Sequence, residues 1–305
     1  MSVALPSGKS ARTAMAWVEL TKPSIISLVL FTGLPALLMA AGPGWPEARV
    51  FWGALAGITL SAASAASFNH YFDRDIDALM RRTQTRPLPS GALPPIAALS
   101  LGFVLAGAAW AVLMLTTNLL ASALAMNNIF YYAIVYTVWL KRRTPQNIVI
   151  GGGAGASAPL IAWAAVTGRL DPPAWLLFGI IFLWTPPHFW ALSLYRRDDY
   201  ARAGIPMLPV THGEAETRRQ ILGYTLVLVP VTLGVAPLAG LSWVYLVPAT
   251  LLGALFLWLA VRLYRKPSTP HAMQMFRFSI LYLFALFMMM TVDAGLAAFG
   301  PPRLG

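Results

Sequence analysis

Nine segments of the chain are each long and apolar enough to cross the hydrocarbon core of a membrane, which takes about 20 mostly apolar residues. Charged residues make up only 11% of the 305 residues, and the mean hydropathy is +0.65. Soluble domains average about 25% charged residues, so the composition excludes an ordinary soluble globule and a disordered chain. The sequence predicts an all-α integral membrane protein with nine transmembrane helices. The predicted spans are Ser24–Ala41, Val50–Phe68, Ile96–Leu115, Leu119–Trp139, Ile148–Val166, Ala174–Leu194, Ile221–Leu238, Trp243–Leu263 and Phe278–Phe299.

The chain has no cysteine, which excludes disulfides, thiolate metal sites, iron–sulfur clusters and a cysteine nucleophile. No long linker or low-complexity stretch interrupts the succession of spans. We therefore expect a cytoplasmic N-terminal segment at residues 1–22, one transmembrane domain at residues 23–299 and a short C-terminal tail at residues 300–305.

The 22 Lys and Arg residues give the chain a net charge of +11, which in a soluble protein would favour nucleic-acid binding. In a nine-span topology, 19 of the 22 fall in the N-terminal segment and in the loops after the even-numbered spans. Short cytoplasmic loops of membrane proteins carry this excess of Lys and Arg. The asymmetry predicts a cytoplasmic N-terminus, an external C-terminus and no nucleic-acid partner.

The end of the second span carries a cluster of acidic residues in a chain that has only 11 of them. If the helix continues at about 100° per residue, Asn69, Asp73 and Asp77 fall within an arc of about 80°, whereas Asp75 lies about 200° from Asp73. Such an oxygen-rich stripe suits Mg²⁺, which is usually held by one or two carboxylates together with substrate phosphates. The alternative is a charged helix end that lies among lipid headgroups, although ionisable residues beside spans are functional by default.

Basic residues on the same predicted side are candidates for binding a diphosphate. Arg81, Arg82 and Arg86 follow the acidic stripe, and guanidinium groups bind phosphate oxygens in bidentate fashion. Lys141 and Arg142 end the fourth span, where they could neutralise the same anion. For these five residues, the alternative is that they only anchor the loops on the cytoplasmic side.

The motif Asn-x-x-x-Asp-x-x-x-Asp at the end of a second span resembles that of the UbiA-type intramembrane prenyltransferases. Within that family, the Asp-Arg-Asp-Ile-Asp core resembles the branch that farnesylates protohaem IX. The further stretches that carry this resemblance are Arg82–Gly91, Tyr136–Thr144, Asn147–Gly155, Thr185–Trp190 and Asp199–Pro209. The resemblance is close from about Lys22 to Gly213 and rests on hydropathy alone over the last three spans.

The resemblance implies a bundle of nine spans around a central cavity, with Mg²⁺ bridging the diphosphate of farnesyl diphosphate. It implies transfer of the farnesyl group to a vinyl group of haem B with addition of water, which gives haem O for respiratory terminal oxidases. Haem B is then a substrate rather than a cofactor. The expected setting is a bacterial inner membrane, with a haem A synthase or a terminal oxidase as possible partners.

The sequence departs from the family pattern after the sixth span. Relatives that prenylate simple aromatic compounds carry a second Asp-x-x-x-Asp there, but this chain has Asp198 and Asp199, and Ala203 stands four residues after Asp199. We expect Asp199 alone to join Asn69, Asp73 and Asp77 as a metal ligand. With Lys141, these four residues form the expected catalytic set.

Candidates for contacting the acceptor haem are His188, His70 and Tyr136. Imidazole is a common ligand of haem iron, and His188 follows Pro186 and Pro187, which favour a break in the sixth span. For each histidine, the alternative is a side chain whose hydrogen bonds are satisfied by a neighbouring helix.

Three other functions remain open at this stage. A prenyltransferase of a quinone precursor or chlorophyllide would usually carry the second Asp-x-x-x-Asp. A secondary transporter would place its acidic residues near the membrane midplane rather than beside arginines at one edge. A non-catalytic assembly factor for a respiratory oxidase would have no need of an intact ligand stripe.

Overall fold

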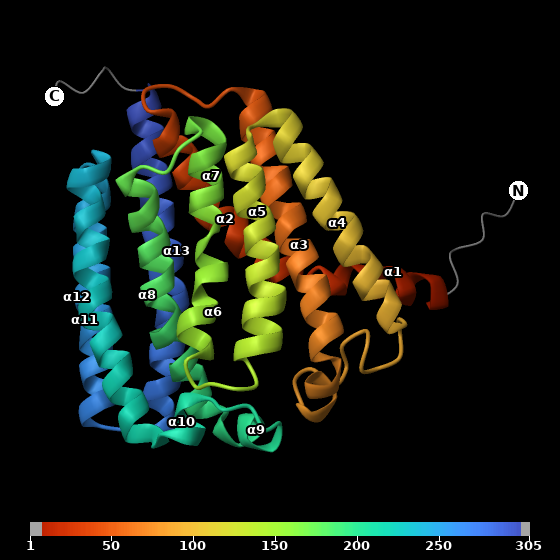
Figure 1. Cartoon of the computed structure of the whole chain (residues 1–305). Helices are drawn as coiled ribbons and strands as arrows, with labels where there is room; N and C mark the ends of the chain where they lie inside the picture. Colours follow the sequence, from red (N-terminus) through yellow and green to blue (C-terminus); the bar gives the residue numbers. More distant parts are fainter. Residues whose placement is uncertain (1–7, 300–305) are drawn as a thin grey trace, which may run out of the picture.

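The computed structural model describes residues 8–299, which form a bundle of long helices (Figure 1). Within those residues, nine spans are long and apolar enough to cross a membrane, so the predicted number is confirmed. The spans are α2 (Pro23–Ala41), α3 (Ala48–Leu79), α4 (Pro95–Thr116), α5 (Leu119–Phe130) with η1 (Tyr131–Leu140), α6 (Asn147–Ala156) with α7 (Ala158–Thr167), α8 (Pro172–Tyr195), α11 (Gly213–Ala239), α12 (Trp243–Arg265) and α13 (Thr269–Phe299). The predicted C-terminal tail at residues 300–305 lies outside the described residues.

Shorter helices cover one end of the bundle. α9 (Arg197–Arg202) and α10 (Leu208–Thr211) lie at that end, and α1 (Gly8–Leu20) runs across the direction of the spans (Figure 1). The second span, α3, extends eleven residues beyond the predicted end at Phe68 and reaches the same end of the bundle. This extension carries Asn69, Asp73 and Asp77 as one continuous helix, as the periodicity of the sequence predicts.

Local sequence signals set several helix boundaries. The side chain of Asn118 accepts a hydrogen bond from Ala121 N at the start of α5, and Ser242 caps α12 in the same way. Proline stands in the first turn of α2, α4 and α8, where its missing N–H has no partner to lose. Gly168 and Gly240 end α7 and α11 in the left-handed conformation that glycine adopts without strain.

The expected break at Pro186 and Pro187 is wrong, because α8 continues through both prolines. In membrane helices, neighbouring helices and nearby side chains can compensate for the hydrogen bonds that proline removes. The interruption occurs instead in the fifth span, at Ser157 between α6 and α7, two residues before Pro159. The fourth span ends in η1, a π-helix, a form that often marks functional sites.

Glycine residues allow neighbouring spans to approach closely. A Cβ placed on Gly57 in α3 would lie 2.3 Å from Cγ of Leu113 in α4. A Cβ on Gly151 in α6 would lie 2.1 Å from Cδ2 of Tyr136 in η1. Glycine at these positions lets neighbouring helices pack without a gap, which is the usual basis of helix association in lipid.

Candidate active site

A polar cavity of about 200 Å³ lies at the end of α3, on the side of the bundle that α9 and α10 cover. Side chains from five separate segments bring their charged or amide groups to it. The charged and amide residues in its lining are Lys22, Asn69, Asp73, Asp77, Arg82, Arg86, Lys141 and Asn147. The predicted stripe of Asn69, Asp73 and Asp77 therefore faces one cavity, together with three of the predicted cations.

The stripe is buried, and basic residues from other segments pair with its oxygen atoms. Lys141 at the end of η1 donates to Oδ2 of Asp73 at 2.5 Å, and Asn69 donates to the same oxygen at 2.7 Å. Arg86 donates to both carboxylate oxygens of Asp77, at 2.9 and 2.7 Å. Buried carboxylates are stable only when such partners offset their desolvation.

From the charge distribution, Lys22 is expected only to help orient the chain in the membrane. In the structure it belongs to this site. Its ammonium donates to Oδ1 of Asn69, and its backbone has φ of 51°, the only positive φ of a non-glycine residue among residues 8–299. Such strained backbone concentrates at functional sites. Desolvation, followed by the charge of Arg86, lowers the pKa of Lys22 to about 7, whereas Asp73 opposes this shift.

The oxygen atoms of the stripe fit a Mg²⁺ ion. Oδ1 of Asp73 is buried and has no hydrogen-bond partner within the described part of the chain. No group of three or more His, Asp or Glu side chains in that part is arranged to hold a metal. Two carboxylates and one amide oxygen still match Mg²⁺, because this ion takes its remaining ligands from water and phosphate.

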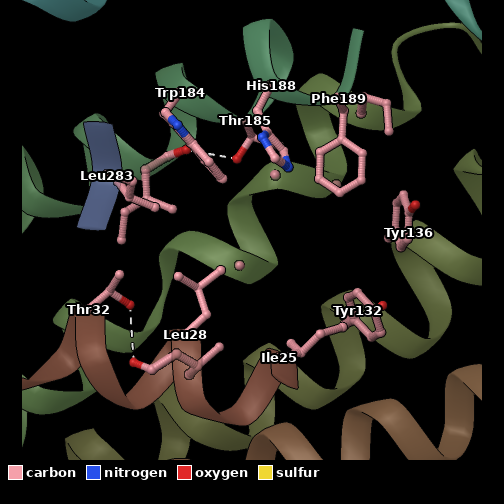
Figure 2. A pocket seen from close by; sticks show the side chains of 16 residues that line it. Ile25, Leu28, Thr32, Tyr132, Tyr136, Trp184, Thr185, His188, Phe189 and Leu283 are labelled. Carbon is pink, nitrogen blue, oxygen red and sulfur yellow. Dashed lines mark hydrogen bonds between the residues drawn. The ribbon is translucent and has the colours of Figure 1, made fainter. Parts of the chain in front are cut away.

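An apolar cavity of about 310 Å³ adjoins the polar one (Figure 2). Ile25, Leu28 and Thr32 of α2 line one side, and Trp184 and His188 of α8 lie across from them (Figure 2). Ile25 and Leu28 are also exposed on the surface of the bundle, 44% and 39% respectively. The cavity therefore reaches the surface that would face lipid.

The two cavities share a wall. The residues that line both are Ile25, Tyr132, Tyr136, Ile148 and Phe189. The rings of Tyr132 and Tyr136 stack with centroids 5.4 Å apart, and Gly151 leaves room for Tyr136 because it has no side chain. A molecule with an anionic head and a long apolar chain would extend from one cavity into the other past these shared residues. Its head would lie among the cations and its chain in the apolar cavity.

Some predicted site residues lie elsewhere. Arg142 pairs with the exposed Asp75, on the side of α3 away from the stripe, and neither of them nor Arg81 lines the polar cavity. His70 is buried and lines neither cavity, and neither of its ring nitrogens has a partner within residues 8–299. Tyr136 and His188 both line the apolar cavity.

The structure does not bring Asp199 to the polar cavity. Its carboxylate pairs with Arg196 and Arg202, each three residues away along the chain. The next residue, Tyr200, is buried and lines the cavity instead, together with Ile205 and Met207. Successive residues of a helix point about 100° apart, and on α9 the side chain that lines the cavity is that of Tyr200.

Sequence reasoning missed the positions of Lys22 and Asn147. Asn147 is buried at the start of α6, donates to the carbonyl of Thr144 at 2.6 Å and lines the polar cavity with its Oδ1 unpaired within the described residues. Both residues lie next to the ends of spans on the basic side of the chain. A search for polar residues at those ends would have found them.

A family model and individual relatives point to the same group of proteins. Residues 29–290 match the UbiA prenyltransferase family. The protoheme IX farnesyltransferase of Hyphomonas neptunium is 49% identical over 300 residues, which cover 94% of this chain and 93% of that protein. The enzyme of the same name from Roseiflexus castenholzii is 49% identical over 284 residues, which cover 92% of this chain. This chain spans only 52% of the length of the Roseiflexus protein.

Solved structures share the fold at much lower identity. A structure concerning digeranylgeranylglyceryl phosphate synthase has a TM-score of 0.78 and 18% identity, and the match covers 92% of this chain and 98% of that one. A UbiA homologue from Archaeoglobus fulgidus, bound to DMAPP and Mg²⁺, has a TM-score of 0.61 and 14% identity over 90% of this chain and 99% of that one. At these identities the similarity establishes the fold alone.

Proposed function

Because this chain belongs to the UbiA prenyltransferase family, we propose that it transfers a farnesyl group from farnesyl diphosphate to a vinyl group of haem B and so produces haem O. The observation that carries this proposal is the shared wall between a cationic cavity and an apolar one. An allylic diphosphate has the matching form, with two phosphate groups at one end and an apolar chain at the other. The names of the relatives support farnesyl as the chain and protohaem IX as the acceptor.

In this proposal the diphosphate lies in the polar cavity. Lys22, Arg86 and Lys141 bind its oxygen atoms, and Arg82 lies within reach in the same lining. Asn69, Asp73 and Asp77 hold Mg²⁺, which when bound offsets the charge that develops on the leaving diphosphate. Arg86 and Lys141 pair with Asp77 and Asp73, and Lys22 donates to Asn69, so a diphosphate bound here competes with the stripe for these cations.

The shared wall protects the allylic carbon after the bond to the diphosphate breaks. Tyr132, Tyr136 and Phe189 offer aromatic faces that stabilise a cation and keep water away from it. The vinyl group of haem attacks that carbon, and water then adds to the cation on the haem side chain and releases a proton. We assign contact with the acceptor to His188 and Tyr136, on the α8 and η1 side of the apolar cavity, and contact with the farnesyl chain to Ile25 and Leu28 on its α2 side.

The chain is a multi-pass membrane protein, and we propose that its basic end faces the cytoplasm of a bacterial cell. In this orientation the polar cavity lies at the cytoplasmic end of the bundle. Residues 23–299 act as one domain, and a haem A synthase or a terminal oxidase is the proposed downstream partner.

The test is product analysis with the purified chain in lipid nanodiscs. Farnesyl diphosphate and haem B are supplied with Mg²⁺ or with a chelator, and the haem products are identified by mass spectrometry. We expect a farnesyl hydroxyethyl haem only when Mg²⁺ is present. Prenylation of 4-hydroxybenzoate instead would identify a quinone-type prenyltransferase, and the absence of any covalent product would support a transporter or an assembly factor.

A further inference from the structure

The hydrogen bonds of His188 determine which ring nitrogen carries its proton. Nδ1 of His188 lies 2.7 Å from Oγ of Ser279 on α13. The same hydroxyl donates to the backbone carbonyl of Phe276 at 2.6 Å, and that carbonyl has no hydrogen of its own to give. We assign the single proton of the serine hydroxyl to that carbonyl, so that the hydroxyl oxygen accepts from Nδ1–H of the imidazole. Nε2 of His188 therefore keeps its lone pair.

Aromatic rings fix the direction in which that lone pair points. The imidazole stacks on Trp184, with centroids 4.3 Å apart and an angle of 18°, and on Phe276, at 4.8 Å and 30°. The edge of Phe189 closes a third side at 5.1 Å. The indole N–H of Trp184 also donates to the carbonyl of Ser279 at 2.7 Å, which ties α8 to the same turn of α13.

The free edge of the imidazole reaches the apolar cavity beside the ring of Phe189 (Figure 2). No side chain among residues 8–299 forms a hydrogen bond with Nε2. A neutral imidazole nitrogen with a free lone pair is a good metal ligand, and Nε2 of His188 presents one to the cavity. His70 offers no such arrangement, because it lines neither cavity.

We propose that Nε2 of His188 binds the iron of the acceptor haem, and that Ser279 is a positioning residue that holds the imidazole in the required tautomer. This inference rests on the proposed function, since it takes haem as the acceptor. Histidine ligands of metals usually donate their other N–H to a second group, which fixes the ring and raises its basicity. Phe189, the next residue along the chain, lines both cavities, so a porphyrin bound at His188 lies beside the site of the diphosphate.

The test is spectroscopy of the purified full-length protein in nanodiscs, titrated with ferric and ferrous haem B. For the wild type we expect an iron–histidine stretching band in the resonance Raman spectrum of the ferrous complex. His188→Ala should lose this band, and added imidazole should restore it. His271→Gln, a change at a distant histidine whose Nδ1 contacts the carbonyl of Lys266, should leave the band unchanged.

Ser279→Ala separates positioning from structural support. We expect a lower iron–histidine stretching frequency and a loss of about 10–100-fold in haem affinity, because an outer-shell partner of a metal ligand usually has that effect. Affinity for metal-free protoporphyrin should stay the same in wild type, His188→Ala and Ser279→Ala, since it depends on the shape of the cavity alone. A fall in that affinity in both variants would mean that the changes distort the cavity, and would overturn the assignment.

Two further outcomes would also overturn the proposal, and both are distinct from a failure of the proposed function. If His188→Ala keeps the wild-type band, or Ser279→Ala keeps the wild-type frequency and affinity, the ligand assignment is wrong even if haem O is still formed. A histidine-dependent band in a wild-type protein that forms no haem O would instead support the ligand assignment and contradict the proposed reaction.

Discussion

Two acid-bearing segments at the same end of the bundle have very different surroundings. On α3, the side chains of Asp73 and Asp77 are 1% and 3% exposed, and they pair with Lys141 and Arg86 from other segments. On α9, Asp199 is 17% exposed and pairs with Arg196 and Arg202 from its own stretch of chain. The two buried carboxylates paired with cations from other segments line a cavity, whereas the partly exposed carboxylate paired with its neighbours does not. Burial and cations from other segments together distinguish the binding site, since the exposed Asp75 pairs with Arg142 from another segment and lines neither cavity.

The largest expected effect comes from the stripe itself. Asp73→Ala and Asp77→Ala should each lower farnesyl transfer by about 10²–10³-fold, the usual loss when one group that stabilises transition-state charge is removed. Asp75→Ala, two residues away on the same helix, is the matched control. Its pair with Arg142 is exposed and contributes only about 0.2–1 kcal/mol, so activity should stay near wild type. Equal losses in all three variants would mean that α3 needs its charges for folding rather than for binding.

Cations that line the cavity and cations outside it should also differ in their effect on activity, although less than the acidic residues do. Arg86→Gln and Lys141→Gln should raise the KM for farnesyl diphosphate by about 10–100-fold, since a hydrogen bond to a charged group contributes about 1.5–3 kcal/mol. Arg202→Gln removes a cation at the same end of the molecule that pairs with Asp199 and lies outside the cavity lining. KM is measured by steady-state kinetics. If Arg202→Gln raises KM as much as Arg86→Gln and Lys141→Gln do, the distinction between the α3 site and α9 is wrong.

Tyr200 tests whether α9 contributes to the site through its aromatic residue. Tyr200→Ala should lower transfer on the order of tenfold, about 1.4 kcal/mol of lost positioning, because the cavity loses part of its wall. The same variant should release more farnesol, since water then reaches the allylic carbon. Tyr200→Phe keeps the ring and should behave like wild type. A ratio of farnesol to haem O that is unchanged in Tyr200→Ala would contradict the role of this wall.

The smallest effect is expected at Asp199. Asp199→Asn should change activity and Mg²⁺ dependence by about twofold or less, because it breaks partly exposed ion pairs of little energetic weight. The concentration of Mg²⁺ that gives half-maximal activity is the measurement. A large rise in that concentration would show that α9 turns toward the cavity when substrate binds, and would restore Asp199 as a metal ligand.

Much of the fold could be predicted because the signals are local. Hydropathy over about 20 residues locates each span, and α2, α4 and α12 begin and end within two residues of their predicted bounds. Helical periodicity places Asn69, Asp73 and Asp77 on one face and Asp75 on another. Proline was the misleading signal, since Pro186 and Pro187 interrupt nothing and the break lies at Ser157.

By itself, the sequence determined the number of spans, the acidic stripe and the segregation of charge, because each depends on residues that are close along the chain. Only the tertiary structure decided which cations meet the stripe, since Lys22 and Lys141 are 47 and 68 residues from the side chains they contact. It also decided that Tyr200 rather than Asp199 faces the cavity. Ser279, 91 residues away along the chain, lies where it determines which ring nitrogen of His188 carries the proton. Such pairings follow from how separate helices pack against one another, and no local pattern in the chain encodes them.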